Sequence, residues 1–215
     1  MKVEIIPNEP AILLRGRRRI LFVADLHIGM IEFYDKKIIE KLKRLVERVK
    51  ADEVIVLGDL KHKIGKFYKL EKLFNGFDIP LAVVKGNHDG RLEGFEVFSS
   101  RGITIGNIGL FHGHAKPSDD VMQSKIIIFA HAHPSILIPD DIGGSKERAW
   151  LFGEFEGKKV IVMPAFNDLC ASTAVNVERP AGVMFKNWDY KNADVLLLDG
   201  TYLGKVEILK PFHLL

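Results

Sequence analysis

Short apolar runs, separated by charged or glycine-containing segments, dominate the beginning of the chain. The runs at residues 10–14 and 20–24 flank an arginine-rich segment, a pattern that predicts a β-hairpin with a charged tip. Over residues 33–50 the apolar side chains instead recur with the period of an α-helix. This segment therefore predicts a helix with one buried face.

The alternation of strand and helix continues further along the chain. Residues 53–57 predict a buried strand, residues 66–77 a second helix and residues 81–85 the next strand. Such a run implies parallel strands joined by crossover helices. Shorter strands are predicted near residues 103–105, 108–111 and 125–130. Beyond residue 148 the pattern becomes strand, turn glycine, strand, which is the signature of antiparallel hairpins.

These elements predict an α/β protein in which a mixed sheet carries helices and a second, largely antiparallel sheet completes the fold. No linker, long repeat or low-complexity segment interrupts the chain. We therefore expect a single domain over residues 1–215.

Composition narrows the class of protein. The chain has one cysteine, Cys170, so neither an internal disulfide nor a cysteine-rich zinc site is expected. The apolar runs are too short to span a bilayer, and Glu4 and Pro7 interrupt the start where a signal peptide needs its apolar stretch. We expect a cytoplasmic protein.

The net charge of +3 is too small to indicate nucleic-acid binding by itself. Gln123 is the only glutamine, which favours a thermophilic source.

Polar side chains of the metal-binding kind follow five of the predicted strands. Six of the eight histidines lie in these segments. The carboxyl ends of strands in α/β sheets are where sites are built, because rigid strands aim short loops at one crevice. The mixed sheet is therefore expected to carry the site. The segments are Asp25-Leu26-His27, Gly58-Asp59, Gly86-Asn87-His88-Asp89, His112-Gly113-His114 and His131-Ala132-His133.

The ligand types favour transition metals. Carboxylate, amide and imidazole groups together suit Mn, Fe, Zn, Ni or Co better than Ca or Mg. There are more ligands than one ion needs, and two ions bridged by one carboxylate would use them all. Each pair separated by one residue, as in Asp25 and His27 or His131 and His133, is expected to point to one side, because alternate positions of a strand share a face.

The five segments, in their order along the chain, resemble the motifs of the calcineurin-like metallophosphoesterases. They span residues 25–133, more than half of the chain. The resemblance implies a four-layer α-β-β-α sandwich and a metal-dependent phosphoric ester hydrolase. Within the superfamily, the stretch Gly58-Asp59-Leu60-Lys61-His62 and the compact length resemble small archaeal and bacterial phosphoesterases related to double-strand-break repair nucleases, including the DNA-ligase-associated type.

The resemblance also implies a role for each residue. Asp25, His27 and His133 would hold one ion, and Asn87, His112 and His131 the other, with Asp59 bridging them. Manganese is the first expectation, with Ni, Zn, Fe and Co as alternatives. A hydroxide between the ions would attack phosphorus in line. His88 would be the general acid for the leaving oxygen, and Asp89 would orient its ring.

Several positions keep an alternative interpretation. His114 could replace His112 as a ligand, or lie near the substrate. His62 is either an exposed loop residue or a substrate contact. Cys170 is expected to be a small buried apolar residue, and His213 a packing or surface residue. The arginine-rich segment at residues 15–19 is either a solvated hairpin tip or a phosphate contact.

The predicted function is hydrolysis of phosphodiesters, with nucleotides or single-stranded nucleic acid as candidate substrates. A phosphomonoesterase is the nearest alternative. A non-catalytic or partner-dependent nucleic-acid-binding subunit with the same fold is the other, and a DNA-repair protein is a candidate partner. No association with a membrane is expected.

Overall fold

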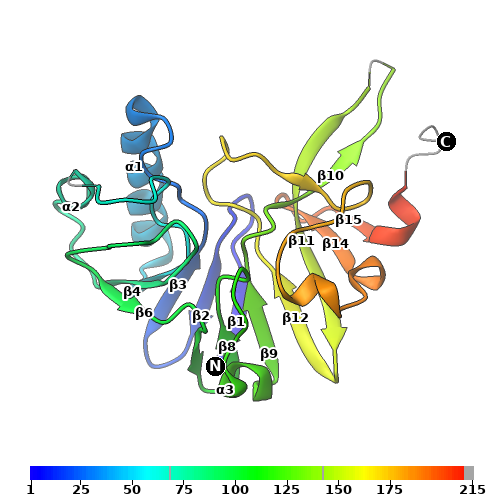
Figure 1. Ribbon diagram of the computed structural model, residues 1–215, viewed down its shortest axis with the longest axis horizontal. Coiled ribbons are helices and arrows are strands. Elements are labelled where there is room, and N and C mark those ends of the chain that lie inside the picture. The colour runs from blue at the N-terminus through cyan, green and yellow to red at the C-terminus, as the bar shows by residue number, and fades with distance from the viewer. Residues whose placement is uncertain (68, 142, 211–215) are drawn as a thin grey trace.

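The computed structural model describes residues 1–67, 69–141 and 143–210. Their strands form two sheets that pack face to face (Figure 1). The first sheet has six strands in the order β1-β2-β3-β4-β5-β6. These are β1 (Lys2–Ile5), β2 (Ile12–Arg15), β3 (Arg19–Val23), β4 (Glu53–Leu57), β5 (Leu81–Val84) and β6 (Glu96–Phe98). The pairs from β3 to β6 are parallel, whereas β1 and β2 are antiparallel to their neighbours.

The second sheet has nine strands and is also mixed. Its main path runs β13-β10-β11-β12-β9-β8-β7, and β14 and β15 extend it beside β11. The pairs β12–β9, β9–β8 and β10–β13 are parallel, and the others are antiparallel. The strands are β7 (Ile103–Ile105), β8 (Ile108–Leu110), β9 (Ile126–Phe129), β10 (Pro134–Ile138), β11 (Ser145–Phe155), β12 (Lys158–Val162), β13 (Thr173–Ala174), β14 (Asp194–Leu197) and β15 (Tyr202–Lys205).

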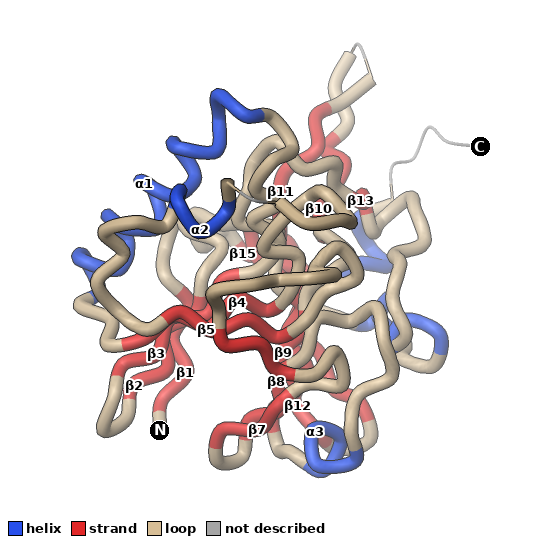
Figure 2. Tube along the Cα trace, turned by 60° about the vertical axis from the view of Figure 1, so that its left-hand side comes forward, coloured by secondary structure: helices blue, strands red, loops and turns tan. Residues whose placement is uncertain are grey.

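Helices cover the outer faces of the two sheets unequally (Figures 1 and 2). The long helix α1 (Glu32–Val49) and the single turn α2 (Leu70–Leu73) lie beside the six-stranded sheet. The outer side of the nine-stranded sheet carries only short elements. They are α3 (Asp119–Gln123) and the 3₁₀ turns η1 (Met184–Lys186), η2 (Tyr190–Asn192) and η3 (Val206–Leu209). The predicted layered α/β fold with two sheets is confirmed, and its last layer is thin.

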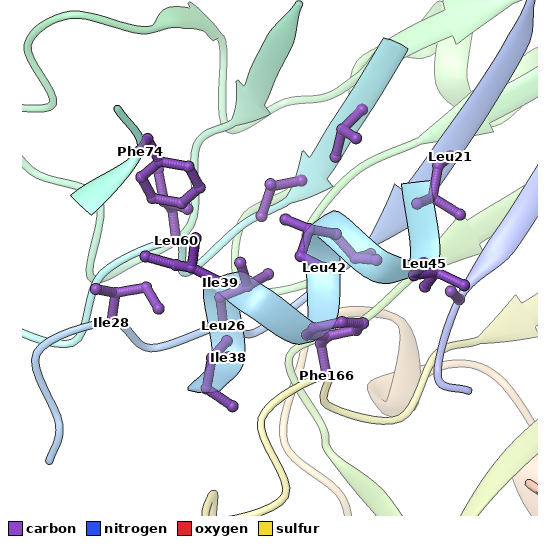
Figure 3. Close-up of a cluster of buried hydrophobic side chains, with 14 of the residues drawn as sticks. Leu21, Leu26, Ile28, Ile38, Ile39, Leu42, Leu45, Leu60, Phe74 and Phe166 are labelled. Atoms are coloured by element: carbon purple, nitrogen blue, oxygen red, sulfur yellow. The ribbon is translucent and has the colours of Figure 1, made fainter. Parts of the chain in front are cut away.

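Three hydrophobic cores hold these layers together. Figure 3 shows the first, in which α1 places Ile38, Ile39, Leu42 and Leu45 against the six-stranded sheet. The second lies between the sheets and includes Trp150, which is fully buried. The third fills the space between the nine-stranded sheet and the short outer elements. Because alternate residues of β3 and β4 enter the first and second cores, these strands are buried on both faces, as their continuous apolar runs predict.

The helix predicted over residues 66–77 is much shorter than expected. Of the residues that the structure describes in this range, only Leu70–Leu73 are helical, and no side chain caps the start of α2. The chain turns at Gly76, whose φ of +73° lies in the left-handed region. Leu70 and Phe74 are nevertheless buried in the first core. The apolar pattern therefore identified the buried residues correctly but overestimated the helix. Tyr68, within the predicted helix, and His213 lie outside the described residues.

The hairpin predicted after residue 148 is present as β11 and β12. Its turn consists of Glu156 and Gly157, with φ values of +50° and +72°, which suits a tight two-residue hairpin. The pattern did not predict β1, β6 or β10. Among the described residues, α1 is the longest helix and it is amphipathic, and no helix has the length and apolar character to cross a bilayer.

Candidate metal centre

Loops from both sheets form the site. Asp25 and His27 follow β3, Asp59 follows β4, and Asn87 and the two residues after it follow β5. His112 follows β8, and His131 and His133 follow β9, so these three histidines come from the nine-stranded sheet. The site therefore lies where parallel strands of two sheets end side by side. The expectation that one mixed sheet would carry the whole site was too narrow.

The backbone at the site is unusual. Among the described residues, nine non-glycine residues have positive φ, and five of them are candidate ligands. The five are Asp25 (57°), His27 (46°), Asp59 (51°), His131 (69°) and His133 (45°). The left-handed region disfavours side chains, and such residues cluster at functional sites. In the pairs Asp25/His27 and His131/His133 both residues lie beyond the end of their strand and in this region. Strand alternation, the reason given by the sequence pattern, therefore does not describe them.

Asp59 lies at the centre of the cluster. It shares one set of possible ligand atoms with Asp25 and His27 and a second set with His112 and His131, and within each set the atoms lie within 4.8 Å of one another. Its Oδ2 lies 3.7 Å from Nε2 of His27 and 3.3 Å from Nε2 of His112. This position between two sets is the one a bridging ligand requires.

Two glycines allow these close approaches. A Cβ atom at Gly86 would lie 2.1 Å from Oδ1 of Asp59, and one at Gly58 would lie 2.3 Å from the His112 ring. Neither distance is possible in a folded protein. The packing of the candidate ligands therefore requires glycine at positions 58 and 86.

The His112 ring is held with one nitrogen free. Its Nδ1 donates a hydrogen bond to the Leu57 carbonyl at 2.8 Å, so Nε2 is the nitrogen that faces Asp59 and becomes available to a metal once its proton leaves. The Asn87 side-chain oxygen lies 3.3 Å from the same Nε2. His114 lies beside His112 and His131 with ring centroids 5.2 and 6.0 Å away, and it belongs to neither ligand set around Asp59. The geometry favours His112 of the two.

Asp25 and His133 form the other side of the cluster. Asp25 is fully buried, and its Oδ1 has no hydrogen-bond partner although it lies 3.2 Å from Nε2 of His133. His133 donates from Nδ1 to the Ala171 carbonyl at 2.9 Å, which again leaves Nε2 free. The backbone N–H of His131 donates to Oδ2 of Asp25 at 3.3 Å. The loop after β9 is thereby attached to the loop after β3.

His88 and His62 lie together at the rim of the cluster. Nδ1 of His88 donates to the His62 carbonyl at 2.6 Å, and the two rings are stacked with centroids 5.3 Å apart. His62 also lies 3.4 Å, nitrogen to nitrogen, from His27. The predicted contact between Asp89 and the His88 ring is wrong. The Asp89 carboxylate accepts from the backbone N–H groups of Gly86 and Lys61, so it shapes the loops instead.

The charges at the site are strongly coupled. Burial alone would raise the pKa of Asp59, but its hydrogen bond with His112, the His112 charge and the His88 N–H keep that pKa far below its usual range. Burial opposes charge on His112 too, yet the hydrogen bond to Asp59 and the charges of Asp25 and Asp59 raise its pKa to about 9. Burial lowers the pKa of both His27 and His131 to about 4, so these two imidazoles are neutral near pH 7.

These residues fit divalent metal ions. The buried carboxylates of Asp25 and Asp59 lie among imidazole nitrogens, and Oδ1 of Asp25 has no hydrogen-bond partner. Hydrogen bonds from Nδ1 to backbone carbonyls orient the His112 and His133 rings so that Nε2 faces these carboxylates. Mixed oxygen and nitrogen donors suit divalent transition metals.

Cys170 is the residue that sequence reasoning placed wrongly. It is only partly buried, and its thiol lies with ring nitrogens of His27 and His133 in a further set of possible ligands. Burial, together with the negative charges of Asp25 and Asp59, raises the pKa of this thiol well above its ordinary value. No strand end precedes Cys170, and so the signal that identified the other site residues does not apply to it.

Known proteins resemble this chain at the level of family and fold. The family model for calcineurin-like phosphoesterases matches residues 18–163. The crystal structure of the nuclease MPE of Pseudomonas putida is 17% identical, with 94% of this chain and 100% of that chain covered and a TM-score of 0.64. Yfce, a phosphoesterase from E. coli, is 15% identical, with 86% and 97% covered and a TM-score of 0.43. No curated protein sequence gives a significant match.

Proposed function

This chain belongs to the calcineurin-like phosphoesterases, and on that premise we propose that it is a dinuclear metal-dependent phosphodiesterase. The observation that carries the proposal is the position of Asp59, which is shared by two ligand sets. One ion would be held by Asp25, His27 and His133, and the other by Asn87, His112 and His131. Asp59 would contact both ions.

The bound ions would supply positive charge against the phosphoryl oxygens and lower the pKa of a water molecule. The other steps belong to the chain's own side chains. His88 donates from Nδ1 to the His62 carbonyl, so Nε2 is the nitrogen left to carry a second proton, and it is this proton that the leaving oxygen would take. His62 stacks on this ring and limits its rotation. In this proposal His62 supports His88 and does not bind the substrate.

We extend the proposal to small phosphodiesters, nucleotides and flexible single-stranded ends as substrates. The Pseudomonas putida protein with a similar fold is a nuclease, and cleavage of a phosphodiester bond is the chemistry that this proposal shares with it. The net charge of +3 supplies few contacts for a long duplex. A DNA-repair protein that presents an end to the site would be the natural partner.

The test is a panel of esters and metals. Metal-free protein is loaded separately with Mn, Ni, Zn or Mg and assayed on bis-p-nitrophenyl phosphate, p-nitrophenyl phosphate, single-stranded DNA and blunt duplex DNA. We expect two ions per chain with a transition metal and preferential hydrolysis of the diester. Asp78→Asn, at an exposed position away from the site, is the control for removal of an acidic group.

Each alternative has its own outcome in this panel. A preference for the monoester would replace the phosphodiesterase by a phosphomonoesterase. Metal binding without hydrolysis of any ester would favour a binding subunit. Long processive digestion of duplex DNA by the protein alone, at the rate seen on small diesters, would contradict the proposed substrate range.

A further inference from the structure

A buried lysine lies directly behind His88. Lys61 is fully buried, and it is among the largest side chains that are. Its Nζ donates hydrogen bonds to the carbonyl of Lys63 at 2.5 Å and to the carbonyl of His88 at 2.7 Å. Both acceptors are backbone carbonyls, one on the loop after β4 and one on the loop after β5. The ammonium group therefore connects two of the loops that form the site.

A buried lysine at such a position destabilises the folded state. Removing an ammonium group from water strongly opposes folding unless hydrogen bonds compensate. An apolar side chain of similar volume would fill the same space without that cost. The role of Lys61 must therefore depend on what its ammonium group holds, and the group it holds is the His88 backbone.

The main chain of Lys61 reinforces the same connection. Its N–H donates to Oδ1 of Asp89 at 3.4 Å, and the residue forms a β-bridge with Ile28 in the loop after β3. The next residue, His62, donates its N–H to the Ile28 carbonyl at 2.9 Å. Loops after three parallel strands thus meet at Lys61. The His62 carbonyl that accepts from the His88 ring belongs to the same segment.

We propose that Lys61 is a positioning residue for His88, an inference that rests on the proposed function only for the role of His88 as proton donor. Its ammonium group clamps the His88 carbonyl to that of Lys63, so the His88 ring meets the His62 carbonyl through Nδ1. This contact fixes the tautomer and leaves Nε2 directed away from the clamp. Without the ammonium group the loop after β5 is free to shift, and Nε2 is displaced from the leaving oxygen.

The first measurement is direct and does not require activity. Lys61→Met keeps the length of the side chain and removes the ammonium group. In nitrogen NMR spectra of histidine-labelled protein, His88→Asn identifies the His88 signals. At a pH at which the ring is neutral, we expect the wild-type ring to carry its one proton at Nδ1 and Lys61→Met to show a mixture of tautomers, with Nε2 open to the second proton that the acid role requires. An unchanged tautomer in a folded Lys61→Met variant would overturn the proposal, whether or not the protein is a phosphodiesterase.

The second measurement is kinetic. A displacement of about 1 Å can cost a catalytic group on the order of 10²-fold in rate. We expect Lys61→Met to lower kcat by about 10- to 100-fold for a diester with a poor leaving group, and by less for a p-nitrophenyl ester. KM and metal content should not change. In the His88→Asn background the same substitution should alter kcat by less than about twofold, because both act through one group.

Two further variants separate positioning from simple support of the fold. Lys72→Met, at an exposed position on α2, is the control for loss of a lysine and should match the wild type. Lys61→Arg keeps the charge and the donors and should recover part of the lost kcat, and it is the variant to use if Lys61→Met does not fold. Equal losses for good and poor leaving groups, or full additivity with His88→Asn, would show that Lys61 only supports the loops.

Discussion

The two sheets contribute to the site in different ways. The six-stranded sheet supplies both carboxylates together with His27 and His88, and backbone hydrogen bonds join its loops to one another. Asp25 donates its N–H to the Gly58 carbonyl and His27 donates to the Asp59 carbonyl, at 3.0 and 2.9 Å. The nine-stranded sheet supplies His112, His131 and His133, and two of these rings are held singly, by the Leu57 and Ala171 carbonyls.

This difference suggests a division of labour within the site. On the six-stranded side the two carboxylates and the proposed proton donor are fixed by a network of hydrogen bonds in which each loop supports the next. On the nine-stranded side the His112 and His133 rings are each oriented by one backbone carbonyl. Changes on the first side should therefore affect the whole centre, whereas changes on the second side should stay local.

The largest effect is expected at Asp59, where the two sides meet. Asp59→Ala removes the only side chain common to the two ligand sets around it. We expect loss of both ions and of turnover, measured by elemental analysis and by hydrolysis of bis-p-nitrophenyl phosphate. If purified Asp59→Ala retains two ions, Asp59 is not a bridging ligand and the two sides of the site bind their ions independently.

His88→Asn should come next in size. The asparagine cannot donate a proton as an imidazolium does, so turnover should fall by roughly 10²- to 10⁴-fold while both metals stay bound. The loss should be smaller for p-nitrophenyl esters, whose leaving group needs little protonation. If the loss is the same for poor leaving groups, His88 positions the phosphate and is not the acid.

His133→Ala tests whether a change on the nine-stranded side affects only the nearer metal ion. Because His133 faces Asp25 and not the second ligand set, its loss should weaken one ion and spare the other. Metal titration followed by calorimetry should then resolve one normal and one weakened site. Equal weakening of both sites would contradict the division between the sheets.

The smallest effect is a pH dependence of metal uptake. Metal-free His112 has a pKa of about 9, so it holds a proton at neutral pH that must leave before Nε2 can bind a metal. Affinity should therefore rise with pH, by up to about tenfold per unit, until pH 9. His27 and His131, with pKa values of about 4, contribute no such release above pH 6.

A matched pair of variants assigns this proton. His114→Asn should keep the release, measured by calorimetry in buffers of different ionisation enthalpy. His112→Asn should lose it together with tight binding at one site. The reverse result would make His114 the ligand.

The sequence predicted α1 and most of the strands closely, because their burial follows a regular period. The strand over 53–57 is observed at those residues, and α1 begins and ends one residue before the prediction. The site residues could be named because each directly follows a strand. Single-turn α2 was overestimated because the apolar period reports burial and carries no information on where backbone hydrogen bonds stop.

Contacts between loops that are distant along the chain could not be predicted from the sequence. Nothing in the stretch from Gly58 to His62 indicates that Lys61 is fully buried or that its ammonium group reaches the His88 carbonyl. The assignment of Asp89 to the His88 ring failed for the same reason. A carboxylate next to a histidine in sequence can be directed elsewhere by the turn between them, as the hydrogen bond from Gly86 shows.

The left-handed backbone at five ligand residues has a consequence for the life of the protein in the cell. Each such residue costs on the order of 1–3 kcal/mol in folding, while a whole domain is stable by only about 5–15 kcal/mol. A glycine would relieve the strain at any of the five, but in the proposed function it would remove a ligand. Selection for a stable fold and selection for a metal-binding fold would therefore oppose each other at these positions. Ions that bind only the folded chain would relax this conflict, so under the proposed function the supply of metal would control how much of the protein stays folded as well as how much of it is active.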